Sequence, residues 1–281
     1  MIRNAMTIDV EDYFHVSAFE NHISKSDWSH LPLRVEKSTD RLLELFDAKN
    51  VHATFFVLGW VADKCPGLVK RIGAQGHEVA SHGYSHGRAT EQTREVFRDD
   101  VKRSRELLED LCGQPVLGYR APSFSVNKSN EWVFDELLEL GFVYSSSTYP
   151  VKHDLYGVPD WPRFKYQRNN GLIEVPLTTL KTGSRNLPIA GGGYFRLYPY
   201  FLTRYFYRKF HQVEKKPGIF YMHPWEIDVD QPRQQGVSFK SSFRHYLNIG
   251  RHLPRLTRML DDFSWGRMDE VFGLNLTGSS S

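Results

Sequence analysis

The sequence predicts an α/β protein built on parallel strands, in the form of a barrel or an open doubly wound sheet. Strand-like and helix-like segments alternate through residues 5–144, which is typical of strands joined by crossover helices. Acidic, histidine and arginine side chains directly follow several predicted strands, and parallel α/β folds carry their sites at that edge. The length of 281 residues is compatible with one barrel-sized domain.

Each predicted strand is a short apolar run, and each predicted helix has apolar residues spaced along one face. We expect strands at residues 5–10, 53–58, 77–80, 116–119, 142–144, 172–177 and 218–222. We expect helices at residues 38–48, 61–74, 92–111, 131–140, 200–212 and 243–260. The second and the last of these helices are expected to be interrupted at Pro66 and Pro254. In the helix at 92–111, the predicted buried stripe includes Val96 and Val101.

The composition is that of an ordinary globular domain and excludes several classes of protein. Lys and Arg number 36 against 33 Asp and Glu, so the net charge of +3 gives no reason to expect a nucleic-acid partner. Two cysteines are too few for a disulfide framework or a cysteine zinc site. The N-terminus lacks the apolar core of a secretory signal, and the longest apolar run, residues 53–62, is about half of a membrane span. We therefore expect a soluble, cytoplasmic protein with no membrane span.

Two histidines four residues apart, His82 and His86, follow directly after the strand predicted at 77–80. On one face of a helical turn, such a pair can bind a metal ion through neutral imidazoles. The chain has 12 histidines, so the spacing also arises by chance, and ordinary surface or core histidines are the alternative. The position after a strand favours the metal site.

Three acidic residues, Asp9, Glu11 and Asp12, follow the first predicted strand within four positions. Carboxylates so close together repel one another unless positive charge lies beside them, and a divalent metal and an arginine would supply that charge. The alternative is an acidic, solvated turn.

Single functional side chains follow two further strands. Arg120 comes after the strand at 116–119, in a loop stiffened by Pro122, and its guanidinium can hold a carboxylate in a fork geometry. His223 follows the strand at 218–222 and can donate a proton near neutral pH. A surface salt bridge and a packed core histidine are the corresponding alternatives.

In their order along the chain, these segments resemble the polysaccharide deacetylase family, the carbohydrate esterases that share the chitooligosaccharide deacetylase homology domain. The similarity extends from about residue 5 to residue 270. The stretches D-V-E-D-Y-F at 9–14, H-P-W-E-x-D at 223–228 and F-R-H-Y-L-N at 243–248 resemble the subgroup associated with bacterial exopolysaccharide clusters and exosortase systems. The resemblance implies a distorted, incomplete (β/α) barrel of about seven parallel strands. It also implies a single catalytic domain over residues 1–281, with a C-terminal extension from about residue 230.

The resemblance implies roles for individual residues. Asp9 matches the catalytic base, Arg120 the arginine that holds this base, and His223 the catalytic acid. His82 and His86 match the histidines that bind a divalent ion, zinc in the first place, with cobalt or nickel as alternatives. Substrate contacts are expected at Tyr119, Pro122, Tyr194 and Trp225, and oxyanion-binding N–H groups are expected near residues 119–121.

Two positions depart from the family pattern. Val10 occupies the place of the second acid in the common D-D pair, so the third metal ligand is Glu11 or Asp12. The D-x-E spacing favours Glu11, because some relatives use D-x-D. The family also has an acid in its fourth motif that partners the catalytic histidine, where this chain has only serine hydroxyls. Asp154 and Asp228 are candidates for its replacement.

The resemblance implies that the protein removes acetyl groups, N-acetyl in the first place, from a polysaccharide or oligosaccharide during exopolysaccharide biosynthesis. Segments 149–161 and 191–198 are expected to line the sugar groove, and Arg163, Lys165 and Arg196 are expected to face an anionic polymer. Two alternatives stay open: a metal-independent hydrolase of cyclic amides with the same fold, and a catalytically impaired relative that binds polysaccharide. The sugar, its linkage and the oligomeric state are left open by the sequence.

Overall fold

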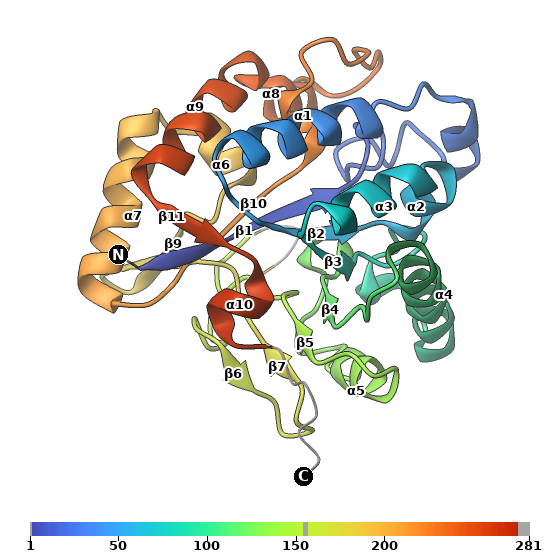
Figure 1. Ribbon diagram of the computed structural model, residues 1–281, viewed down its shortest axis with the longest axis horizontal. Helices are drawn as coiled ribbons and strands as arrows, with labels where there is room; N and C mark the ends of the chain where they lie inside the picture. Colours follow the sequence, from blue (N-terminus) through green and yellow to red (C-terminus); the bar gives the residue numbers. More distant parts are fainter. Residues whose placement is uncertain (1, 154–156, 275–281) are drawn as a thin grey trace.

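A curved sheet of nine strands forms the centre of the protein, as seen in a computed structural model that describes residues 2–153 and 157–274 (Figure 1). These strands are β1 (Arg3–Val10), β2 (Thr54–Val57), β3 (Glu78–Ser81), β4 (Gly118–Tyr119), β5 (Tyr144–Ser145), β6 (Tyr166–Gln167), β7 (Ile173–Glu174), β10 (Ile219–Met222) and β11 (Ser264–Gly266). A separate antiparallel hairpin consists of β8 (Thr179–Thr182) and β9 (Arg185–Pro188).

The sheet is an open barrel. Its parallel part has the strand order β10-β1-β2-β3-β4-β5-β7, and β6 pairs antiparallel with β7 at one end. The strand β11 is a third parallel partner of β1 and pairs with its first residues, Arg3 to Ala5. Among the described residues no ladder joins β10 to β6, so the barrel is incomplete. The predicted fold class, a distorted, incomplete barrel of about seven parallel strands, is confirmed.

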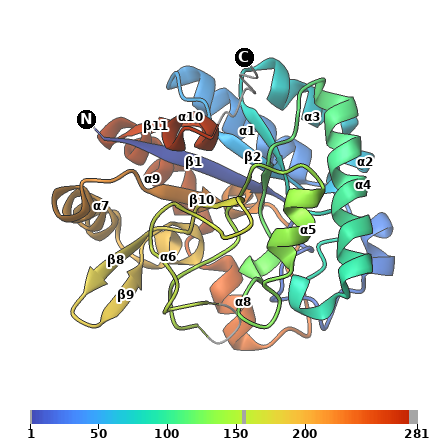
Figure 2. The ribbon, with the colours of Figure 1, turned by 90° about the horizontal axis from the view of Figure 1, so that it is seen from below.

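Helices cover the outer face of this sheet (Figure 2). They are α1 (Val35–Ala48), α2 (Gly59–Lys64), α3 (Pro66–Ala74), α4 (Arg94–Cys112), α5 (Val133–Glu139), α6 (Gly192–Leu197), α7 (Tyr200–Glu214), α8 (Phe239–Tyr246), α9 (Ile249–Asp262) and α10 (Met268–Phe272). Short 3-10 helices span Lys25–His30, Ala89–Glu91, Pro122–Phe124 and Pro224–Ile227. All the predicted strands and helices have counterparts here. The sequence did not predict β6, β8, β9, α6, β11 and α10, which are short or lie in stretches without a clear apolar period.

Two details of the predicted helices are wrong. In α4 the buried residues include Phe97 and Val101, whereas Val96 is 55% exposed. The reason is that the Phe97 ring packs on Tyr119, so the helix face that carries Phe97 is the one turned toward the core. The last predicted helix does not break at Pro254, which lies inside α9. The break falls at Asn248, whose positive φ of 54° is a conformation that asparagine tolerates.

The alternation of side chains along β1 determines which residues face the interior of the barrel. Met6, Ile8 and Val10 belong to the main core beneath the helices, whereas Thr7 and Asp9 point inward, where both contact Arg120. Successive residues of a strand face opposite sides, so a D-x-E sequence at the end of β1 sends both acids to the inner side. The carboxyl ends of the parallel strands thus bring separate sequence segments to one edge.

A buried carboxyl group at the opposite end of the sheet gives a prediction about stability. Glu78 begins β3 and accepts hydrogen bonds from Thr54 and Tyr144. Burial, and then the nearby Asp269, raise the pKa of Glu78 from 4.5 to about 7. Because the folded protein holds this proton to a higher pH than the unfolded chain, this group makes the free energy of unfolding fall as pH rises from 4.5 to about 7. We compare the two proteins by the Tm of Glu78→Gln minus the Tm of the unsubstituted protein. This difference should become more positive as pH rises across this range.

Thermal unfolding followed by circular dichroism at several pH values between 4.5 and 7 tests this expectation. Glu106→Gln, on the exposed side of α4, is the matched control and should show a nearly constant difference in Tm. A Tm difference for Glu78→Gln that does not change with pH would contradict the raised pKa.

Candidate active site

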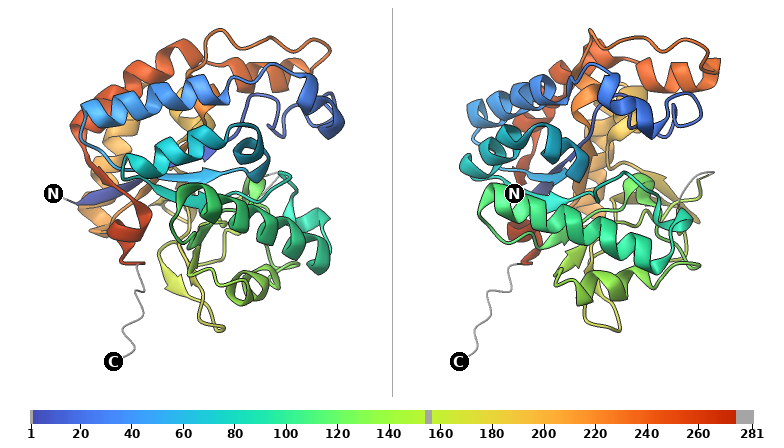
Figure 3. Two further views of the ribbon diagram at one scale, coloured as in Figure 1. Left: turned by 45° about the vertical axis from the view of Figure 1, so that its right-hand side comes forward. Right: turned by 90° about the vertical axis from the view of Figure 1, so that its right-hand side faces the viewer.

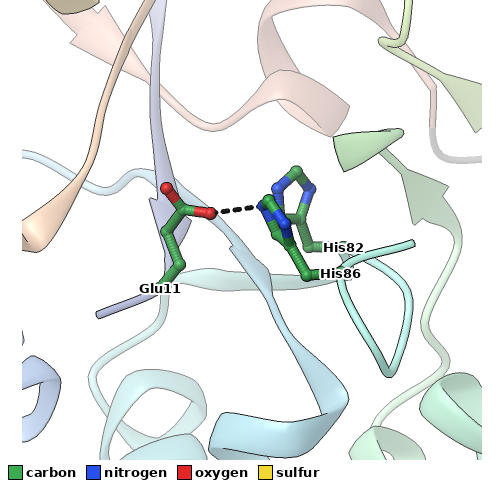
Figure 4. Close-up of side chains that lie close together, drawn as sticks. All are labelled: Glu11, His82 and His86. Atoms are coloured by element: carbon green, nitrogen blue, oxygen red, sulfur yellow. Dashed lines mark ion pairs between the residues drawn. The ribbon is translucent and has the colours of Figure 1, made fainter. Parts of the chain in front are cut away.

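Three side chains from two separate segments converge at the carboxyl edge of the barrel (Figure 4). Glu11 lies just after β1, and His82 and His86 lie in the loop after β3. One potential ligand atom from each of the three lies within 4.8 Å of the other two, and Glu11 Oε2 is 2.6 Å from His86 Nε2. The expected cluster of Glu11 with the two histidines is therefore present as a geometric fact.

We expected a helical turn to bring His82 and His86 together, but in the structure a loop does so. Residues 82–88 form no helix, and the loop turns through positive φ values at Gly83 and His86. The His82 ring is held because its Nδ1 bonds to the carbonyl oxygen of Arg120 at 2.8 Å, which leaves Nε2 for another partner. The His86 ring stacks on that of His15, with centroids 6.2 Å apart. The loop, and not an i,i+4 helix face, orients the pair.

This donor set fits a divalent metal such as zinc. Two imidazoles and one carboxylate are a common set of three protein ligands for a catalytic zinc ion, which leaves further positions open. Burial lowers the pKa of His82 to about 4, so its imidazole is neutral, the form that binds a metal. Burial by itself would raise the pKa of Glu11, but His86, His223 and His82 lower it far below its usual value, so the carboxylate is charged.

A buried ion pair lies beside this cluster. Asp9 Oδ1 accepts a hydrogen bond from Arg120 Nη1 at 2.7 Å, and both side chains are almost completely buried. Arg120 is itself fixed by Thr7 and by the carbonyl and hydroxyl oxygens of Ser146. In the region of the fourth motif, the Ser146 hydroxyl therefore supports Arg120. Asp9 keeps its second oxygen, Oδ2, directed toward His223, at 4.0 Å from Nε2.

His223 has a carboxylate partner that sequence reasoning missed. Its Nδ1 lies 2.6 Å from Glu226 Oε1, and its Nε2 lies 3.5 Å from Glu11 Oε1. The 3-10 helix Pro224–Ile227 folds the chain back so that Glu226, three residues on, reaches the imidazole. Burial alone would lower the pKa of His223, but Glu11, Glu226 and Asp9 raise it to about 9. The signal was present in the H-P-W-E stretch, as an acid at i+3 with proline at the start of a turn.

Of the two candidate replacements for the missing acid, only Asp228 is among the described residues, and it does not take this place. Asp228 forms an ion pair with Arg34, and Asp154 lies outside the described residues. Glu226 is in turn bound by Arg196, whose guanidinium is buried and 3.1 Å from Oε2. Arg196, which we expected to face an anionic polymer, is therefore buried in an ion pair with Glu226. Arg163 pairs with Glu214, and Lys165 donates to a backbone carbonyl oxygen.

Several other expected site residues lie elsewhere. The carboxylate of Asp12 accepts hydrogen bonds from the backbone N–H groups of Arg34 and Val35 at the start of α1, so it does not join the metal cluster. Tyr119 is buried in the core between Phe97 and Phe142, because Arg120 points inward and side chains alternate. These two assignments are wrong.

The loop that follows β4 also differs from expectation. Pro122 is buried at the start of a 3-10 helix, and it is not among the residues that line the site cavity. The N–H groups of Arg120 and Ala121 already donate to the Ser81 carbonyl oxygen and the Ser147 hydroxyl. They are therefore not available to bind an oxyanion.

Three adjoining cavities lie at the candidate metal ligands. A cavity of about 160 Å³ is lined by Asp9, Glu11, both histidines of the cluster, His223 and Trp225. It shares Ser17 and His86 with a polar cavity of about 610 Å³. It shares Tyr221 and Trp225 with a more apolar groove of about 480 Å³, where Tyr194 lies. Trp225 donates from Nε1 to Glu11 at 3.3 Å, so it contacts both the cluster and the groove.

The described part of the chain has no helix long and apolar enough to cross a membrane.

Comparisons with known proteins agree with this architecture. Residues 28–144 match the family model described as polysaccharide deacetylase, and residues 146–273 match a domain of unknown function, DUF3473. Residues 28–144 are therefore similar to the polysaccharide deacetylase family. The site is divided between the matched regions, because the two histidines of the cluster lie in the first and His223 in the second, while Asp9 and Glu11 precede both.

Relatives with known descriptions show the extent of this similarity. The chain is 39% identical over 114 residues to a peptidoglycan deacetylase of Helicobacter pylori, a match that covers 40% of this chain and 37% of the relative. The matched segments span between 19% and 47% of the length of the curated relatives.

Solved structures show the same fold over nearly the whole chain. A structure from Mycobacterium smegmatis, assigned to the polysaccharide deacetylases, has a TM-score of 0.58 at 22% identity and covers 96% of this chain and 88% of its own. PuuE allantoinase has a TM-score of 0.61 at 16% identity and covers 100% and 92%. At these identities the likeness concerns the fold alone.

Proposed function

We propose that this protein is a metal-dependent hydrolase that removes acetyl groups, N-acetyl in the first place, from an oligosaccharide or polysaccharide. The observation that carries the proposal is the meeting of three groups at one edge of the barrel. These are the cluster Glu11–His82–His86, the Asp9–Arg120 pair and the His223–Glu226 pair. A protein that only bound polysaccharide would have no need of two such pairs beside a cluster of metal-binding type.

The residues divide the work of hydrolysing an acetamide. A divalent ion held by Glu11, His82 and His86 would supply Lewis-acid polarisation of the acetyl carbonyl and a lowered pKa of the attacking water. Asp9, held at Oδ1 by Arg120, accepts the proton of the water through its free Oδ2 as the new C–O bond forms. His223 then gives its proton to the sugar nitrogen as the C–N bond breaks, which leaves acetate and a free amine.

The shape of the cleft supports a substrate longer than one sugar. The polar cavity and the apolar groove each share lining residues with the central cavity at the metal cluster. Trp225 and Tyr194 offer aromatic surfaces along the groove, against which the apolar face of a sugar ring can pack. A chain of sugars could thus reach the cluster with neighbouring units bound in the adjoining cavities.

Acetate release is the direct test of this proposal. The purified protein is stripped with a chelator and assayed on acetylated chitooligosaccharides and peptidoglycan fragments, with zinc, cobalt or nickel added back. We expect no acetate from the stripped protein and recovery with at least one of these metals. Undiminished release after complete removal of metal would favour the metal-independent amide hydrolase, and retention on the glycan without acetate would favour the impaired binding relative.

A role in exopolysaccharide biosynthesis is part of the proposal and rests on the three segments at 9–14, 223–228 and 243–248. We further propose that residues 1–281 form one catalytic domain with an extension from about residue 230. In support, β10, which lies in the region matched by DUF3473, pairs directly with β1 and brings His223 to the cluster.

Glu226 provides a prediction within this site. Glu226→Gln keeps the size of the side chain but removes the charge that holds the His223 imidazolium, so we expect kcat per folded molecule to fall about tenfold or more, with KM little changed. Steady-state kinetics with acetate detection measures both constants. Equal metal content in the variant is the control, because Glu226 lies outside the metal cluster. An unchanged kcat would show that the carboxylate does not support proton donation by His223.

A further inference from the structure

The outer side of α8 carries two exposed aromatic side chains, Phe239 and Phe243. Their exposed fractions are 86% and 51%, and their rings stack with centroids 6.2 Å apart. Leu197, at the end of α6, is 51% exposed and lines the same apolar groove as Phe243. Large apolar side chains that gather on an exposed surface mark a contact with a partner or a membrane.

The same helix carries positive charge and no negative charge. Lys240 and Arg244 each follow one of the two phenylalanines, and both are exposed. The segments 175–213 and 231–260 together contain twelve Lys and Arg and no Asp or Glu, although the whole chain has 36 basic and 33 acidic residues. The remainder of the chain is therefore acidic on balance, and the positive charge is concentrated in the part that contains α8.

We propose that α8 is a docking surface for a lipid bilayer that contains anionic lipids. Phe239 and Phe243 enter the boundary between headgroups and acyl chains, while Lys240 and Arg244 contact the phosphate groups beside them. Aromatic residues flanked by Lys and Arg on a short helix, with no acidic residue nearby, are the combination that anchors a helix in the plane of such a surface. In Figure 3, α8 lies at the edge of the molecule as an orange helix, where a flat surface can reach it.

Charge complementarity favours a bilayer over a second copy of this chain. Two α8 surfaces facing each other would bring Lys240 and Arg244 of one copy against the same residues of the other, without an acid on the helix to pair with them. The position of α8 also has a consequence for the cleft. The groove beside α8 leads to Trp225 and from there to the metal cluster, so a glycan held at the membrane surface would have a short path to the site.

Co-sedimentation with vesicles tests the docking surface independently of any enzymatic activity. The full chain is mixed with vesicles of phosphatidylcholine alone or of phosphatidylcholine and phosphatidylglycerol in equal amounts. We expect binding to the mixed vesicles only. The double variant Lys240→Gln/Arg244→Gln should bind about 25-fold more weakly, at about fivefold for each basic residue, and Phe239→Ser/Phe243→Ser about tenfold more weakly.

Matched controls lie on other helices, namely α3, α4 and α5. Val96→Ser/Leu138→Ser removes exposed apolar side chains there, and Lys70→Gln/Lys102→Gln removes exposed charge from α3 and α4. Both controls should bind as the unsubstituted protein does. The proposal is overturned if the controls weaken binding as much as the α8 variants do. It is also overturned if only the charge variant weakens vesicle binding, which would indicate a site for soluble polyanions. A third contradicting result is that the α8 variants change the oligomeric state in light scattering without changing vesicle binding.

Discussion

Replacing His82 by alanine is expected to abolish metal binding and acetate release together. The variant leaves only His86 and Glu11 of the three proposed ligands, and it removes the neutral imidazole that the Arg120 carbonyl oxygen orients. A metal bound by the folded state alone raises the free energy of unfolding by about 2.7 kcal/mol when its free concentration is about 100-fold above Kd. The unsubstituted protein should therefore show a rise in Tm on addition of zinc, and His82→Ala should show none.

Metal analysis of the dialysed protein and thermal unfolding with and without zinc measure this effect. His30→Ala is the matched control, because His30 is an exposed histidine outside the cluster, and it should keep both the metal and the rise in Tm. If His82→Ala retained stoichiometric zinc and most of the acetate release, these histidines would not be the metal ligands.

Replacing Asp9 by asparagine is expected to separate catalysis from metal binding. The amide keeps an oxygen for Arg120 Nη1 but cannot accept a proton from water at the position of Oδ2. Loss of a general base lowers turnover typically about 10²–10⁴-fold, and we expect a fall in kcat within this range. Metal content should stay near that of the unsubstituted protein, because Asp9 is not one of the three clustered ligands.

The controls for this variant address folding and surface charge. Removing the Asp9 charge leaves the buried Arg120 guanidinium less compensated, so the Tm should be measured to ensure that the assay temperature lies well below it. Asp63→Asn, at an exposed position of α2, should leave kcat unchanged. A variant Asp9→Asn with most of its activity would show that another group takes the proton.

Much of the site could be predicted because its residues follow successive strands. Parallel strands bring their carboxyl ends to one edge, so the order of Asp9, His82, Arg120 and His223 along the chain was enough to expect them together. The D-x-E spacing, which resembles the D-x-D of some relatives, likewise favoured Glu11 over Asp12, and the alternation of β1 gives the physical reason. The same alternation applies to β4: because Arg120 points into the barrel, its neighbour Tyr119 must point into the core. This alternation would have excluded Tyr119 as a substrate contact, but the sequence interpretation did not use it.

The remaining features depend on tertiary structure that no local pattern reports. Glu226 acts on His223 only because a 3-10 turn folds it back, and Asp12 serves as a cap because α1 begins beside it. From the sequence alone, Arg196 was expected at the surface as a free positive charge. In the fold it is buried and bound to Glu226. The hairpin β8–β9 and α6 arise in a stretch without a regular apolar period, where packing determines the local structure.

The convergence of Glu11, His82 and His86 on one cation beside Asp9 is the central claim of this account. Anomalous diffraction from crystals soaked in zinc, measured on both sides of the zinc absorption edge, locates the ion directly. The account predicts one strong peak at about 2.0–2.2 Å from a carboxylate oxygen of Glu11 and one nitrogen of each histidine. A peak bound elsewhere, with these three side chains free of metal at full soaking, would contradict it.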